Sequence, residues 1–102
     1  MIKLTLAAAL TLSAAAAPAF AASKKETDCA HQAAVVSAVQ AARVARVPER
    51  KVKETVLAGE VTWPERYNNA IPLFSAEIYK LKVRDLKKTD LGEEWKATCL
   101  AN

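Results

Sequence analysis

The pattern of apolar and polar positions divides the chain into an apolar leader and four segments of helical periodicity. The first segment is expected to form a helix from Asp28 to Arg46, after a polar tether over residues 22–26, with Thr27 or Asp28 as its cap. Drawn at about 100° per residue, its alanines and valines cover most sides of the helix. A helix that is apolar on most sides is usually buried at the centre of a domain.

The second segment is expected to be a short helix from Pro48 to Ala58. Proline suits the first turn of a helix, and Gly59 is well placed to end it. The last segment is expected to begin at Asp90, whose carboxylate can cap it, and to place Trp95 and Cys99 on one face.

The third segment carries the strongest local signals and one ambiguity. Its start, Thr62-Trp63-Pro64-Glu65, is typical of a capping box. Pro72 falls inside the helical pattern, so we expect a kink there, and Ser75 is expected to cap a second piece that runs to about Lys87. Residues 79–84 alternate apolar with basic, as a strand does. We interpret them as helix because a lone strand has no evident partner, and the alternative stays open.

Residues 1–21 are interpreted as a secretory signal peptide, with Lys3 at its start and cleavage after Ala21. The apolar run is shorter than the roughly 20 residues that span a bilayer, and no later segment could span one. We therefore expect no transmembrane segment after cleavage, and a periplasmic location. The remaining residues 22–102 would form a single helical domain. Loss of Lys3, the one charged residue of the leader, lowers the formal net charge from +4 to +3.

The two cysteines are expected to form a disulfide. An oxidising compartment preserves paired cysteines, and Cys29 with Cys99 is the single intramolecular pairing available. Closing a loop of about 70 residues is worth ~4 kcal/mol in the chain-entropy description. Two free thiols or a redox pair are the alternatives, although the Cys-x-x-Cys spacing of a redox pair is absent. The sequence thus predicts an all-α fold: a small antiparallel bundle of four helical segments, the third kinked at Pro72, with its two ends joined by the disulfide.

Catalysis finds little support in the sequence. His31 is the only histidine, and it lies two residues from Cys29, so on a helix the two side chains diverge. Glu93 and Glu94 are adjacent on a helix and point in different directions, which suits the helix dipole better than a general acid–base pair. One histidine and two cysteines cannot by themselves build a zinc cluster. We therefore expect no catalytic residue, no metal site and no cofactor.

The best candidate for binding is a basic stripe near the end of the third segment. On a continuous helix Lys80, Arg84, Lys87 and Lys88 would share one face. Such a stripe could meet anionic lipid, lipopolysaccharide, a cell-wall polymer or an acidic protein, and the alternative is a solvated face that keeps the protein soluble. Nucleic acid is not expected as the partner of a secreted chain with so small a net charge.

Four large aromatic side chains are the remaining candidates for a binding site. At helical spacing they are more often part of a core than of a ligand cage, although they could line an apolar groove if Pro72 opens the bundle. They are Trp63, Tyr67, Phe74 and Trp95.

Three stretches of the sequence resemble those of a known protein family: QAARVARVPERKV, TWPERYNNAIPLFSAEIYKLKVRDL and TDLGEEWKATCLAN. They are similar to a family of small secreted helical proteins of proteobacteria. The likeness covers most of residues 22–102 and implies a periplasmic helical domain with a terminal disulfide, but no activity and no site residue. A weaker resemblance is to acid-stress chaperones of the HdeA type, which are also small, periplasmic, helical and held by one disulfide. In this chain, however, the cysteines lie at the two ends and no motif matches.

These observations predict a non-enzymatic binding or interaction protein of the cell envelope. The alternative is an HdeA-like chaperone that responds to acid. The sequence leaves the partner and the oligomeric state open.

Overall fold

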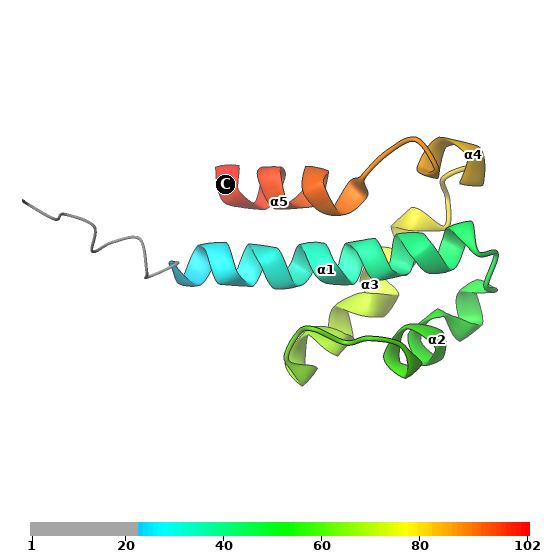
Figure 1. Ribbon diagram of the computed structural model, residues 1–102, viewed down its shortest axis with the longest axis horizontal. Helices are drawn as coiled ribbons and strands as arrows, with labels where there is room; N and C mark the ends of the chain where they lie inside the picture. Colours follow the sequence, from blue (N-terminus) through cyan, green and yellow to red (C-terminus); the bar gives the residue numbers. More distant parts are fainter. Residues whose placement is uncertain (1–22) are drawn as a thin grey trace, which may run out of the picture.

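The structure is a computed structural model that describes residues 23–102, so the predicted signal peptide lies outside the described residues. Within this range the chain is helical throughout and contains no strand (Figure 1). The α-helices are α1 (Lys24–Val44), α2 (Val52–Ala58), α3 (Ala70–Ile78), α4 (Val83–Leu86) and α5 (Leu91–Ala101), and two 3-10 helices, η2 (Glu49–Lys51) and η3 (Glu65–Asn69), precede α2 and α3. The predicted all-α class is confirmed.

Helix α1 begins four residues earlier than the sequence pattern predicted. The Ser23 side chain accepts a hydrogen bond from the Glu26 amide, and the Glu26 side chain accepts one from the Ser23 amide. This reciprocal arrangement is a capping box. The predicted tether and the predicted cap at Thr27 or Asp28 are therefore wrong, because the Ser-x-x-Glu signal lies upstream of the first apolar positions of the helix.

Helix α1 ends at Val44 rather than at Arg46, in a left-handed turn. Arg46 has a φ of 63°. Its amide donates to the carbonyl of Arg43, and the amide of Val47 donates to that of Ala42. These two bonds form a Schellman motif, which uses helical carbonyls that would otherwise lack partners. An arginine therefore occupies a position that usually favours glycine.

The second and third segments both start as 3-10 helices. The predicted helix from Pro48 to Ala58 consists of η2 followed by α2, and Gly59 is its C-cap as predicted. No side chain caps η3, so the predicted capping box at Thr62 and Glu65 is wrong. Pro72 is the third residue of α3. In a helix an amide there would bond to the carbonyl of Asn68, which lies in η3, so the proline falls at the junction of η3 and α3 and interrupts no bond between residues of α3. The predicted kink at Pro72 is not confirmed.

The predicted helical piece from Ser75 to Lys87 is wrong. Helix α3 ends at Ile78, a turn follows, and the separate short helix α4 begins at Val83. Ser75 lies inside α3, where its hydroxyl donates to the carbonyl of Pro72. The alternative of a strand over residues 79–84 is also wrong.

The core surrounds α1, which lies at the centre of the structure (Figure 1). Val35 and Val39 are fully buried, and Val52 of α2 and Ile71 of α3 pack into the same cluster. Because α1 is apolar on most sides, it can contact the other helices on several faces at once. The expectation of a centrally buried first helix agrees with this arrangement.

Helices α1 and α5 lie side by side and run in opposite directions (Figure 1). They meet through small residues: a Cβ placed on Gly92 would lie 2.9 Å from the carbonyl oxygen of Ala33. The predicted disulfide between Cys29 and Cys99 is confirmed, with Cα atoms 5.7 Å apart. The antiparallel bundle of four segments is not confirmed in detail, because residues 23–102 form five α-helices rather than four.

Candidate functional site

The four residues of the predicted basic stripe do not lie on one helix. Lys80 is in the turn after α3, Arg84 is in α4, and Lys87 and Lys88 follow the end of α4. The expectation of a single helical face is therefore wrong, because the backbone turns between α3 and α4. All four side chains are exposed. The structure places them instead along a short connection, which we call the basic segment, residues 80–88.

The basic segment holds the entire positive excess of residues 22–102. It contains five Lys or Arg and one Asp, a net charge of +4. Because residues 22–102 carry +3 in total, the rest of that range carries −1. Two exposed ion pairs touch the segment, Lys80 with Glu77 at 3.2 Å and Arg84 with Asp85 at 3.5 Å. Exposed pairs of this kind are weak and screened by salt, so they leave the local charge available to a partner.

The side chains of Arg43 in α1 and of Tyr79, the C-cap of α3, hold the start of the basic segment in place. The Arg43 guanidinium donates two hydrogen bonds, of 3.2 and 3.0 Å, to the carbonyl of Leu81 and lies 5.2 Å from the centroid of the Tyr79 ring. The Tyr79 hydroxyl donates to the carbonyl of Val47 at 2.6 Å. Burial raises the pKa of Tyr79 above its ordinary value. These bonds fix the turn between α3 and α4.

Gln40 of α1 holds the other end of the basic segment. Its amide nitrogen donates to the carbonyls of Leu86 and Thr89 at 2.8 and 2.7 Å, and its carbonyl accepts from the Leu91 amide at 3.1 Å. Val83 and Leu86, which belong to the segment, are buried and anchor α4. Gln40 and Arg43 were not among the residues predicted from the sequence to form a site. Their signal was present, since both are long polar side chains on a helix that is otherwise largely apolar.

One large apolar side chain lies exposed within the basic segment. Leu81 is 41% exposed and is flanked by Lys80 and Lys82, both of which are also exposed. Its carbonyl is the group that Arg43 binds. The backbone is therefore fixed at this point, while the side chain remains accessible to a partner.

A second surface feature is an apolar groove of about 470 Å³ between α3 and α5. Val36 of α1 also lines it. Phe74 and Trp95 meet in the groove edge to face, with ring centroids 5.0 Å apart. Of the four aromatic residues expected in the core, Trp63 and Tyr67 are buried there, whereas Phe74 and Trp95 line this groove.

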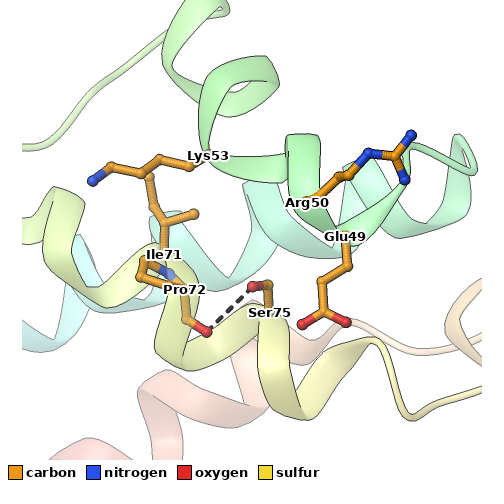
Figure 2. A pocket seen from close by; sticks show the side chains of 6 residues that line it. All are labelled: Glu49, Arg50, Lys53, Ile71, Pro72 and Ser75. Carbon is orange, nitrogen blue, oxygen red and sulfur yellow. Dashed lines mark hydrogen bonds between the residues drawn. The ribbon is translucent and has the colours of Figure 1, made fainter.

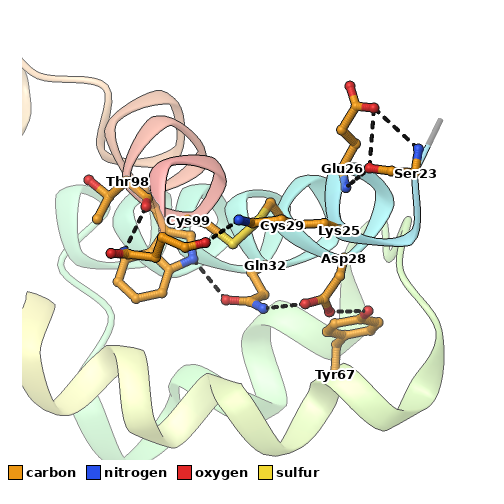
Figure 3. Close-up of a disulfide and its surroundings, with 11 residues drawn as sticks. Ser23, Lys25, Glu26, Asp28, Cys29, Gln32, Tyr67, Thr98 and Cys99 are labelled. Carbon is orange, nitrogen blue, oxygen red and sulfur yellow. Dashed lines mark hydrogen bonds between the residues drawn. A yellow bond between two sulfur atoms is a disulfide. The ribbon is translucent and has the colours of Figure 1, made fainter. Parts of the chain in front are cut away.

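A hydrogen-bond chain connects α1, η3 and α5 near the disulfide (Figure 3). The Tyr67 hydroxyl and the Gln32 amide both donate to the Asp28 carboxylate, at 2.5 and 2.9 Å, and Trp95 donates to Gln32 at 2.9 Å. The bond to Asp28, together with burial, raises the pKa of Tyr67 above its ordinary value. This series of hydrogen bonds orients the Trp95 ring at the edge of the apolar groove.

A polar pocket of about 530 Å³ lies between η2–α2 and α3, and contains a buried serine (Figure 2). Glu49, Arg50 and Lys53 border it. The Ser75 hydroxyl donates to the carbonyl of Pro72 at 3.2 Å, so its proton is directed at the backbone. A nucleophilic serine donates its proton to a base instead, so Ser75 is not activated for catalysis in this arrangement.

The remaining candidate groups have structural partners. The His31 ring packs in a tilted arrangement against the Tyr67 ring, with centroids 5.1 Å apart, and both cysteines are oxidised. Across residues 23–102 no three His, Cys, Asp or Glu side chains gather as a metal site would require. In the same range no helix combines the length and the hydropathy needed to cross a bilayer.

Comparisons of the chain with protein-family models, with curated proteins and with solved structures find no match. The resemblance to small secreted proteobacterial proteins therefore stays a prediction.

Proposed function

We propose that this protein is a non-catalytic binding protein of the periplasm that contacts an anionic surface of the cell envelope through the basic segment. The observation that carries the proposal is the charge distribution: the nine residues of the segment carry +4, and the rest of residues 22–102 carries −1. Charge concentrated in this way steers a protein toward an anionic partner in a fixed orientation.

Leu81 favours an anionic lipid surface over a soluble acidic protein as the partner. An exposed leucine between lysines can enter the boundary between head groups and acyl chains while the ammonium groups remain with the phosphates. Each Lys or Arg near an anionic bilayer contributes about 1 kcal/mol. Because Arg43 and Gln40 fix the backbone of the segment, little conformational entropy is lost on binding.

The test is cosedimentation of residues 22–102, with the disulfide intact, with vesicles that contain phosphatidylglycerol. We expect binding that is lost on pure phosphatidylcholine vesicles and at high salt. Reversing four charges, Lys80→Glu, Arg84→Glu, Lys87→Glu and Lys88→Glu, should weaken partitioning about a thousandfold, since each removed cation is worth about 1 kcal/mol.

The matched control reverses four exposed cations elsewhere: Lys24→Glu, Arg50→Glu, Lys51→Glu and Lys53→Glu. It changes the net charge by the same amount. Equal loss of binding in the two variants would show that only total charge matters and would refute a role for the basic segment.

The proposed periplasmic location has its own test. A disulfide between Cys29 and Cys99 is compatible with an oxidising compartment. Mass spectrometry of the protein from a periplasmic extract should show a chain that begins at Ala22 and contains the disulfide. An intact leader would contradict the proposal.

A second candidate function is an acid-activated chaperone, which the apolar groove favours. The groove exposes Leu73 and Trp95 to solvent, and a chaperone needs apolar surface to hold unfolded clients. This function predicts that mild acid increases binding of an apolar dye and suppresses aggregation of a client protein. A protein that changes in neither respect between neutral pH and about pH 2 would exclude it.

A further inference from the structure

We infer that the apolar groove between α3 and α5 is a docking site for a cationic amphipathic helix of a partner protein. The lining of this groove shares no residue with the basic segment, although Lys80 of the segment pairs with Glu77 at the edge of the groove. The expected occupant is a cationic helix, whereas the basic segment is proposed to contact an anionic surface. The inference therefore stands or falls independently of the proposed contact with an anionic surface.

The lining of the groove presents two rows of side chains at helical spacing. On α3, Leu73 and Phe74 are each followed four residues later by another lining residue, Glu77 and Ile78. On α5 the lining residues are Leu91, Glu94, Trp95 and Thr98. Leu73 is 70% exposed and Trp95 is 37% exposed. Exposed apolar side chains that converge on one groove mark a site of association.

The geometry suits a helix better than an extended segment. Helices α3 and α5 each pack on α1, and their side chains meet where Phe74 contacts Trp95. A partner helix lying between them would become a further member of the bundle and would bury Leu73. An extended peptide usually binds by adding to a sheet edge, and residues 23–102 contain no strand. A helix satisfies its own backbone hydrogen bonds, so it needs only an apolar groove.

The charges at the edge of the groove select a cationic occupant. The polar side chains that line it are Glu77, Glu94 and Thr98, and none of them is basic. The Lys80 ammonium lies 3.2 Å from Glu77, which shows that a cation fits at this edge. Among residues 23–102, Glu94 has no ion-pair partner. Lysines or arginines beside the apolar face of a partner helix would pair with Glu94 and would compete with Lys80 for Glu77, whose exposed ion pair is weak.

The same carboxylates disfavour two other occupants. A fatty-acid carboxylate or a phosphate head group would be repelled at Glu77 and Glu94. A second copy of this chain, docked groove to groove, would bring the two acidic edges together. A cationic helix combines burial of Leu73 and Trp95 with charge pairing at Glu77 and Glu94.

The test uses a synthetic helical peptide of about 15 residues made of leucine and lysine, with the leucines on one face and a fluorophore at one end. Its counterpart carries glutamate in place of lysine. Fluorescence anisotropy with residues 22–102, disulfide intact, measures the dissociation constant of each peptide. We expect saturable binding of the leucine–lysine peptide and none of the leucine–glutamate peptide. The protein is cationic overall, so this preference would reflect the acidic edge of the groove and not the total charge.

Matched variants locate the binding site. The double variant Glu77→Lys and Glu94→Lys should weaken binding about tenfold, which corresponds to roughly 1.4 kcal/mol. The control Glu54→Lys and Glu93→Lys changes the net charge equally at exposed positions outside the groove and should bind like the wild type. Leu73→Asn should also weaken binding, whereas Val61→Asn, at another exposed apolar residue, should not.

Three results would overturn the inference. Equal weakening by the edge variant and its control would mean that only total charge matters. Equal affinity for the two peptides would mean that only apolar contact matters. A dimer in sedimentation equilibrium that Leu73→Asn dissociates would identify the groove as an interface between two copies of this chain.

Discussion

Replacement of Gly92 by alanine tests whether close approach of α5 to α1 holds the fold together. Gly92 is the second residue of α5 and is buried against α1. An ideal Cβ there would overlap the hydroxyl oxygen of Ser37 and would lie 2.9 Å from the carbonyl oxygen of Ala33. The Ser37 side chain can rotate away. The Ala33 carbonyl belongs to the backbone of α1 and cannot, so α5 must move.

Helix propensity and packing predict opposite effects of this substitution on the free energy of unfolding. Alanine is favoured over glycine in a helix by up to about 1 kcal/mol. Forcing a methyl group into a filled contact costs about 1–3 kcal/mol. Because the clash involves backbone, we expect packing to dominate and Gly92→Ala to lower the free energy of unfolding by about 1 kcal/mol. In a domain of this size that corresponds to a fall of roughly 4–8 °C in Tm.

The assay is urea denaturation of oxidised residues 22–102, followed by circular dichroism. Gly59→Ala is the matched control, because a Cβ there would meet the nearest backbone oxygen at 3.6 Å, an ordinary contact, and its φ is −96°. We expect this control to be as stable as the wild type or slightly more stable. The double variant Ser37→Ala with Gly92→Ala removes the hydroxyl contact but keeps the contact with Ala33, so it should recover only part of the loss.

A Gly92→Ala protein at least as stable as the wild type would refute the reasoning. It would mean that α5 can move away from α1 without loss, and hence that small-residue contact between these helices contributes little. Complete recovery in the double variant would place the steric conflict at the Ser37 side chain instead of the α1 backbone.

Four further predictions concern the contacts that hold the fold together. Replacing Cys29 and Cys99 by alanine should lower the free energy of unfolding by ~4 kcal/mol, measured against the wild type without reductant; an equal midpoint would refute a stabilising role for the crosslink. Gln40→Ala removes three hydrogen bonds to the basic segment and its flank and should cost about 1–3 kcal/mol in the same assay, with faster amide exchange in α4. Arg46→Gly should stabilise the protein by about 1 kcal/mol, because glycine adopts a φ of 63° without strain, and a loss of stability would contradict this. The hydrogen bond that Tyr67 donates to the Asp28 carboxylate raises the pKa of Tyr67 above 10.0. The stability that this bond contributes is therefore complete below about pH 10 and is lost as the pH rises through the pKa of Tyr67 in the folded protein. The urea midpoint should fall less steeply above about pH 10 in Tyr67→Phe than in the wild type.

Local signals in the sequence were sufficient for part of the fold. The helical periodicity predicted the all-α class, Gly59 marked the end of α2, and Asp90 caps α5 as expected. The pairing of Cys29 with Cys99 followed from their number and from the expected compartment. The helical features depend on residues close in sequence, and two cysteines allow one intramolecular pairing. The start of α1 is also encoded locally, by Ser23 and Glu26, but this capping signal lies before the point where the apolar periodicity begins.

Tertiary structure decided the features on which the two candidate surfaces depend. The pattern from Ser75 to Lys87 permits a continuous helix, yet the chain turns after Ile78 because Arg43 binds the carbonyl of Leu81 and Tyr79 binds that of Val47. Those partners lie more than 30 residues apart, so no local window contains them. The groove likewise forms only where α3 and α5 meet on α1. Helical periodicity and cysteine number were therefore enough for the all-α class and the disulfide, because each is a local or single-choice property. The turn after α3 and the surfaces that follow from it depend on hydrogen bonds between side chains and backbone carbonyls far apart in the sequence.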